Sequence, residues 1–347
     1  MKLGRFLFLL AAFLILLTAC MPANTGGQQQ LTPEGMQQVY LCTKVTVTSG
    51  NIPDTTDLSY DSNGNLVLRQ RTENGRVCGI TRYTYDDHNN ILTEAGIHPD
   101  DGHVTYSCEY TYSDQGYQVV RKSYNLDSTL SHEYSTSYDA HGRLLCDGNT
   151  LYYYDESGNM VKWENLTLNS FSTFQYENNN LLTQIYYERG SEIYRYEKTY
   201  DAQGHLLIDS HIDNGVEIDR NEYSYDTKGN KTEQKYFEYD ILKYHTTYTY
   251  DEQGNLLEFV SLELSTGHKD KTTYTYDHQN RKLSEEHMQG NQPYRYTWTY
   301  DDFGNLVSYV IYRNGDLMGY ANWQYVAVVL PTEQAQKVIE QQKSIFN

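Results

Sequence analysis

Apolar and polar residues alternate along most of the chain, in runs of about seven residues. In residues 106–112, three tyrosines and a cysteine alternate with serine, glutamate and threonine, and residues 244–250 and 294–300 follow the same pattern. Alternation with a period of two is typical of a β-strand that buries one face. After each run, a turn-like segment leads into a second strand-like run that opens on an aliphatic residue. The pattern therefore predicts pairs of antiparallel strands.

A turn of the type Tyr-Asp-x-x-Gly ends the first strand of each pair. The best copies lie in residues 138–145 and 250–257. The aspartate suits a turn in which its side chain accepts backbone N–H bonds, and the glycine takes a positive φ that other residues resist. We therefore expect a tight hairpin that ends in a bulge. The tyrosines of these turns are Tyr60, Tyr85, Tyr112, Tyr138, Tyr154, Tyr176, Tyr200, Tyr225, Tyr250, Tyr276 and Tyr300.

Successive turn tyrosines are 16 to 27 residues apart, which is room for two strands and a second, more variable turn. The predicted fold class is therefore all-β, with a long antiparallel β-meander of about 22 strands over residues 39–330. Because strand twist accumulates, such a sheet should curl into a spiral or open shell with its aromatic face inward. The alternative is a propeller with two repeats in each four-stranded blade, although eleven repeats leave half a blade.

The N-terminal segment differs from the repeats. Lys2 and Arg5 precede an apolar run over residues 6–17. A run of 12 residues is too short to span a bilayer, which takes about 20. Residues 1–19 are therefore predicted to be a signal peptide, and the polar residues 20–38 a flexible tether.

The C-terminal segment, residues 331–347, changes from the strand pattern to a helical one. Ala335, Val338 and Ile339 share one helix face. A terminal repeat exposes its core unless something covers it, so we expect this segment to be a short capping helix.

Residues 17–20, Leu-Thr-Ala-Cys, resemble the lipobox of bacterial lipoproteins. The resemblance implies that Cys20 is acylated through its thiol and becomes the N-terminus of an exported protein, anchored to the cell membrane and facing away from the cytoplasm. Two acyl chains suffice for stable anchoring.

The repeated turn resembles the YD repeats of the Rhs and teneurin families, whose pattern is Tyr-Asp-x-x-Gly-Arg/Asn-Leu. The resemblance implies that the repeats wind into a hollow β-shell, which encloses a toxin in some members, and it implies a link to carbohydrate binding. No Asp-Pro-x-Gly-Leu segment, which marks the autocleavage region in that family, follows the last repeat, and the segment after Tyr300 is too short for a toxin domain. Residues 151–161 also resemble a choline- or glucan-binding cell-wall repeat.

Composition and charge narrow the range of partners. The chain has 36 Tyr against 9 Phe and 3 Trp, and tyrosine combines an apolar ring with a polar tip. The formal charge of −19 becomes −21 when the predicted signal peptide takes Lys2 and Arg5 with it. So acidic a chain repels nucleic acid and anionic lipid headgroups, so we expect no nucleic-acid partner and a membrane link through the lipid anchor alone.

Motifs for catalysis are missing from the sequence. It has no Gly-x-Ser-x-Gly, no His-Glu-x-x-His and no phosphate-binding glycine loop, so we expect no catalytic residue and no cofactor. The densest group of metal-ligand residue types is His98-Pro99-Asp100-Asp101-Gly102-His103. It falls where the variable turn belongs, and Asp-Gly suits a hairpin turn, so a turn is expected there and no metal site.

The candidate binding residues are Tyr294, Tyr296, Trp298 and Tyr300, which are expected to form a row of rings on one strand face. Their spacing of about 6.5–7 Å suits stacking on successive sugars. The alternative is that Trp298 belongs to the core under the C-terminal helix.

The function predicted from the sequence is that of a non-enzymatic cell-surface lipoprotein. Its repeat scaffold is expected to bind a glycan or cell-wall polymer, or a protein partner. The alternatives are a reduced Rhs-type shell, a polymorphic-toxin accessory, or a glycan-processing enzyme with two carboxylates about 5–9.5 Å apart in a deep pocket.

The lipid anchor generates the first testable prediction. Replacing Cys20→Ala removes the thiol that carries the lipid, so the variant should take up no azido-palmitate in metabolic labelling and should leave the membrane or stay unprocessed. Equal labelling of the wild type and the variant would contradict the prediction.

Overall fold

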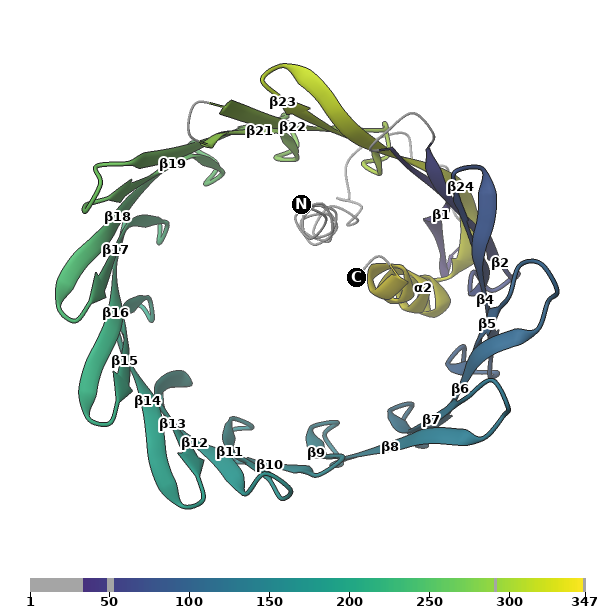
Figure 1. Ribbon diagram of the computed structural model, residues 1–347, viewed down its shortest axis with the longest axis horizontal. Helices are drawn as coiled ribbons and strands as arrows, with labels where there is room; N and C mark the ends of the chain where they lie inside the picture. Colours follow the sequence, from purple (N-terminus) through teal and green to yellow (C-terminus); the bar gives the residue numbers. More distant parts are fainter. Residues whose placement is uncertain (1–33, 49–52, 290–291, 346–347) are drawn as a thin grey trace. The chain divides into compact units, whose positions relative to one another are not determined.

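The computed structural model describes residues 34–48, 53–289 and 292–345 (Figure 1). Within these residues the chain forms 24 β-strands and one α-helix, α2 (Thr332–Ile345). The predicted all-β antiparallel meander with a short C-terminal helix is therefore confirmed. The predicted signal peptide and Cys20 lie outside the described residues.

Two compact units make up the described chain. Unit 1 holds the residues up to 133 and those from 294 on, and unit 2 holds residues 134–293. The boundaries fall inside β8 (Leu130–Tyr138) and β22 (Gln292–Tyr300). The other strands of unit 1 are β1 (Met36–Thr48), β2 (Asp54–Tyr60), β3 (Leu66–Glu73), β4 (Arg76–Tyr85), β5 (Ile91–Ile97), β6 (Val104–Tyr112), β7 (Gln118–Tyr124), β23 (Leu306–Arg313) and β24 (Asp316–Pro331). Those of unit 2 are β9 (Leu144–Asp147), β10 (Thr150–Tyr154), β11 (Met160–Asn165), β12 (Ser170–Glu177), β13 (Asn180–Glu188), β14 (Ser191–Tyr200), β15 (Leu206–Asp213), β16 (Val216–Tyr225), β17 (Lys231–Glu238), β18 (Ile241–Tyr250), β19 (Leu256–Glu263), β20 (Lys269–Tyr276) and β21 (Lys282–Gln289).

Unit 1 joins the two ends of the meander. Its strands pair antiparallel in the order β22, β23, β24, β1, β2 and on to β7. The ladder between β1 and β24 runs from Met36 opposite Pro331 to Thr48 opposite Tyr320. The expected spiral or open shell is therefore wrong, because the meander closes through its first and last strands. An open meander would leave a row of unpaired backbone groups on each edge strand, and this pairing satisfies both.

Unit 2 is an uninterrupted run of hairpins. Each strand from β8 to β21 pairs antiparallel with the next one in the sequence. The ladders within a repeat and between repeats follow each other without a break. The described strands therefore do not separate into the four-stranded blades of the propeller alternative.

The Tyr-Asp turns have the predicted local structure. In the turn between β18 and β19, the Asp251 N–H donates to the Asn255 carbonyl (3.0 Å), and the Gly254 N–H donates to the Asp251 carbonyl (3.2 Å). The Asp251 carboxylate accepts the backbone N–H (2.7 Å) and the side-chain amide (2.8 Å) of Asn255. Gly254 has φ +88°, and the register shifts by one residue at Tyr250, as a bulge requires.

A contact that the pattern did not reveal joins most of the repeats to the one before them. The hydroxyl of a turn tyrosine donates to the carbonyl of the residue at or next to the start of the second strand of the preceding repeat, as Tyr225 does to Leu206 (2.8 Å). Equivalent bonds of 2.7–3.1 Å are made by Tyr85, Tyr112, Tyr154, Tyr176, Tyr200, Tyr250 and Tyr276. Two related bonds lie at the ends of the meander, where Tyr60 donates to the Cys42 carbonyl within β1 (2.7 Å) and Tyr325 of β24 donates to the Leu306 carbonyl (2.9 Å).

The helix α2 packs beside β1 and β24 (Figure 1). Ala335 and Val338 are buried against Val39, Leu41 and Leu330. Polar side chains on α2 also bind nearby backbone, since Gln334 donates to the Asn63 carbonyl (2.8 Å), Lys337 to the His88 carbonyl (3.2 Å) and Gln342 to the Tyr40 carbonyl (3.2 Å). Among the described residues, no helix combines the length and apolarity needed to cross a membrane.

The turn geometry leads to a ranking of two substitutions. Gly254→Val forces a β-branched residue into positive φ and should lower the free energy of unfolding by about 1–3 kcal/mol. Thr249→Val, at an exposed position on the adjoining strand, should change it by less than about 0.5 kcal/mol. Urea unfolding of both variants checks the order, and a larger loss for Thr249→Val would refute the assignment of turn and face.

Candidate functional site

The four rings predicted for ligand stacking lie on β22. Tyr294 is 6% exposed and Trp298 is 5% exposed. Trp298 packs on Tyr309 with ring centroids 5.3 Å apart, and Tyr296 stacks on Tyr309 at 6.0 Å. Tyr296 and Tyr300 are partly buried against the same cluster. Tyr294 and Trp298 therefore offer no open ring face to a sugar. The stacking role of the four rings stays a prediction.

The terminal repeat around Trp298 is well covered. The cluster around Trp298 includes Leu58 from β2 and Trp323 from β24, because the closure through β1 brings strands from both ends of the chain together. Trp298 is thus a core residue, as the alternative had it. Its described neighbours come from strands rather than from α2.

A different set of rings, in unit 2, is only partly buried. We name Trp163, Tyr186, Tyr194, Tyr196 and His211 the central ring row. Trp163 lies opposite Ser172, Ser172 opposite Tyr186 and Tyr186 opposite Tyr194, so one level of the sheet carries a ring on three of four adjacent strands. Tyr196 lies opposite His211 on the next pair.

The rings of this row touch in sequence. Their centroids are 6.1 Å apart for Trp163 and Tyr186, 5.0 Å for Tyr186 and Tyr194, 5.6 Å for Tyr194 and Tyr196, and 4.9 Å for Tyr196 and His211. The small Ser172, which is fully buried, lets the rings from β11 and β13 approach each other above β12. Burial raises the pKa of Tyr194, with Tyr196 and Tyr186 adding to the effect, so its hydroxyl stays a hydrogen-bond donor at neutral pH.

Polar groups flank the row on the same face. His211 Nδ1 lies 3.1 Å from the Asp219 carboxylate. Lys198 binds Asp209 on the neighbouring strand. The arrangement therefore combines ring faces with groups that donate and accept hydrogen bonds, which is the composition of a small-molecule binding surface.

The aspartate side chains of the Tyr-Asp turns form hydrogen bonds within their own turns. The Asp226 carboxylate accepts bonds from the Asn230 N–H, the Asn230 side chain and the Lys228 N–H, each at 2.9 Å. The hydrogen bond from the Asn230 side chain, together with the backbone bonds, lowers the pKa of Asp226. A carboxylate that its own turn keeps ionised is a poor general acid. We therefore assign these aspartates a structural role in the turns.

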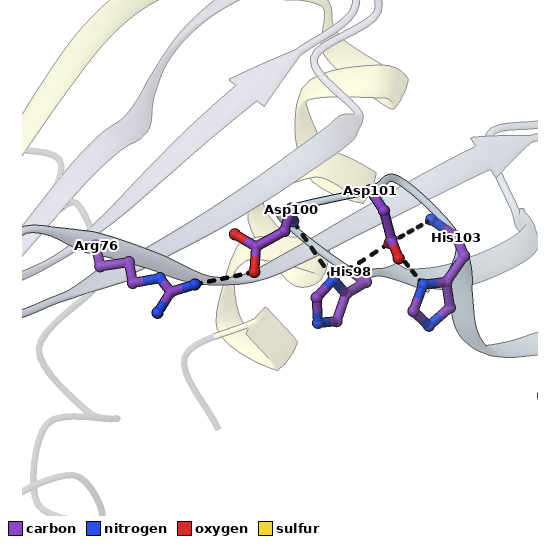
Figure 2. Close-up of polar contacts among 5 residues, drawn as sticks. All are labelled: Arg76, His98, Asp100, Asp101 and His103. Atoms are coloured by element: carbon purple, nitrogen blue, oxygen red, sulfur yellow. Dashed lines mark hydrogen bonds and ion pairs between the residues drawn. The ribbon is translucent and has the colours of Figure 1, made fainter.

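The turn between β5 and β6 holds the residues of metal-ligand type identified in the sequence (Figure 2). The expected hairpin is present, since the His98 N–H donates to the His103 carbonyl (2.8 Å) and the Gly102 N–H to the His98 carbonyl (3.0 Å). The side chains of His98, Asp101 and His103 also converge, with ligand atoms that all lie within 4.8 Å of one another.

Comparison with known proteins gives one family match. Residues 59–96, which cover the first complete repeat, match the family model described as RHS Repeat. Among curated proteins, none matches the chain.

Three of the solved structures to which the chain is similar share 10–16% sequence identity with it. The crystal structure of TcdB2-TccC3 with Cdc42 is 15% identical over 77% of this chain and 18% of its own, with a TM-score of 0.41. The Tc holotoxin pore of Photorhabdus luminescens is 16% identical over 81% of this chain and 18% of its own, with a TM-score of 0.40. A porin-like protein from Bacteroides uniformis is 10% identical over 82% of this chain and 98% of its own, with a TM-score of 0.28. This chain thus spans less than a fifth of the length of the two Tc chains.

Proposed function

We propose that this RHS-repeat protein is a lipid-anchored, non-enzymatic scaffold on the outer side of the cell membrane, and that it binds a glycan through the central ring row. The observation that carries the proposal is the row itself. Five rings from four strands follow one another at 4.9–6.1 Å without being buried.

The chemistry of the row suits a sugar polymer. Ring faces attract the apolar C–H faces of sugars, and such contacts add about 0.5–1.5 kcal/mol each beyond area burial. Asp209 and Asp219 lie beside the rings and are paired with Lys198 and His211, so both acceptors and donors are in reach of sugar hydroxyls. The net charge of −19 disfavours polyanionic polymers, so a neutral or amino-sugar glycan is the expected class.

The lipid anchor rests on the sequence alone. The apolar run before Leu-Thr-Ala-Cys supports export, and Cys20 supports attachment without a membrane-spanning helix. A tethered scaffold of this kind holds its binding face near the cell envelope, where wall polymers are abundant.

A protein partner is the second candidate, and a specific observation favours it. Large apolar side chains protrude from the variable turns of unit 2, with Leu166 60% exposed, Leu168 66% exposed and Ile241 61% exposed. Exposed apolar groups at turn tips are suited to a protein interface.

Binding at the central ring row is tested with a glycan array and tryptophan fluorescence. Trp163 is only partly buried, whereas Trp298 and Trp323 are buried, so a glycan found on the array should shift the emission of the wild type but not of Trp163→Phe. Tyr196→Ala should weaken the affinity about two- to twelve-fold.

The matched control is Tyr239→Ala, which removes an exposed ring on a variable turn away from the row and should bind as the wild type does. Thermal melting of each variant separates loss of binding from loss of folding. Unchanged affinity in a folded Tyr196→Ala variant, or an array without a single bound glycan, would contradict the proposal.

A further inference from the structure

The turn between β5 and β6 brings three metal-type donor atoms to one point (Figure 2). His103 Nδ1 lies 2.6 Å from Asp101 Oδ1, and His98 Nδ1 lies 3.2 Å from the same oxygen. Within the described part of the chain, no other group of three such residues converges in this way. The feature is independent of the proposed glycan binding.

The backbone of the hairpin holds the two imidazoles together. His98 and His103 close the turn through a backbone hydrogen bond of 2.8 Å, which places their side chains next to each other. The two rings are nearly parallel, with an interplanar angle of 13° and centroids 4.9 Å apart. Gly102, at φ +75°, permits the reversal that carries Asp101 between them. The positions of the donor atoms are thus fixed by a short hydrogen-bonded loop and not by long flexible side chains.

The neighbouring Asp100 is directed elsewhere. Its carboxylate forms an ion pair with Arg76, which follows the preceding variable turn. The guanidinium nitrogen lies 2.9 Å from the carboxylate oxygen. Figure 2 shows this pair on the side of the turn away from the imidazole of His103. Two adjacent aspartates therefore have different roles, with one carboxylate in the cluster and one in a link between turns.

We propose that His98, Asp101 and His103 form a binding site for a late divalent transition metal such as zinc, nickel or copper. Ligands bonded at about 2.0–2.2 Å in tetrahedral or octahedral geometry lie about 2.9–3.5 Å apart. The His98–Asp101 distance of 3.2 Å is already in that range. The His103–Asp101 distance of 2.6 Å is that of a hydrogen bond, and a metal that replaces the shared proton needs a separation only a few tenths of an ångström longer.

The donor set selects the kind of metal. Imidazole nitrogen suits zinc, copper and nickel, whereas calcium and magnesium prefer an all-oxygen shell. Three protein ligands leave at least one coordination position for water or for an external ligand. The side chains are 41–62% exposed, so the site is open to solvent.

The test is calorimetric titration of the full-length protein, in detergent and without a polyhistidine tag, with zinc chloride. The wild type should show a saturable site. Asp101→Asn and His103→Gln should each lower its affinity at least about ten-fold, because each removes a ligand. Calcium chloride should give no comparable binding.

Two matched controls make the result specific. Asp100→Asn removes the same charge one position away and should leave the affinity unchanged. His268→Gln removes an exposed histidine that lies 3.0 Å from Asp270 on another variable turn, and it should also leave the affinity unchanged. Circular dichroism confirms that each variant is folded. Absence of saturable zinc binding in the wild type, or equal losses in Asp100→Asn and Asp101→Asn, would overturn the proposal.

Discussion

The hydroxyls of most turn tyrosines reach a backbone carbonyl on the preceding strand, at the end where the strands of two neighbouring repeats diverge. The ladder between β15 and β16 ends at Ile208 opposite Glu222, two residues short of Leu206, so the strands diverge at the end near the Tyr-Asp turns. Tyr225 spans that gap and donates to the Leu206 carbonyl. The same divergence recurs between the other repeats, for example beyond Thr183 opposite Glu197, where Tyr200 binds the Leu181 carbonyl.

This bond explains why the turn position holds tyrosine and not phenylalanine. A phenylalanine there leaves a carbonyl without its donor. Burial raises the pKa of Tyr60 and of Tyr85, so these hydroxyls remain protonated donors at physiological pH. The ring supplies apolar contact on the strand face while its tip satisfies the backbone. One residue type thus links repeats that share few fully buried side chains.

Local rules were enough to predict the strands, the Tyr-Asp turns and the C-terminal helix, because each depends on residues within one repeat. The pairing of β1 with β24 joins segments almost the whole chain apart, and no local pattern marks it. The burial of Trp298 depends on the same pairing, because β1 brings Leu58 and Trp323 to the cluster around this ring. The central ring row depends on the register between β11 and β14, which the turn lengths of short repeats set. The convergence of His98 and His103 on Asp101 rather than Asp100 depends on side-chain direction, which the pattern of residue types does not give.

The account rests most directly on the tyrosine hydroxyls, and one substitution isolates them. Tyr225→Phe keeps the ring and deletes only the donor to the Leu206 carbonyl, while Tyr239→Phe makes the same change at a ring that is 60% exposed. Urea unfolding should show that Tyr225→Phe lowers the free energy of unfolding by about 0.5–1.5 kcal/mol, because a partly buried acceptor loses its partner. Tyr239→Phe should stay within about 0.5 kcal/mol of the wild type. Equal stability of the two variants would contradict the claim that these hydrogen bonds hold successive repeats together.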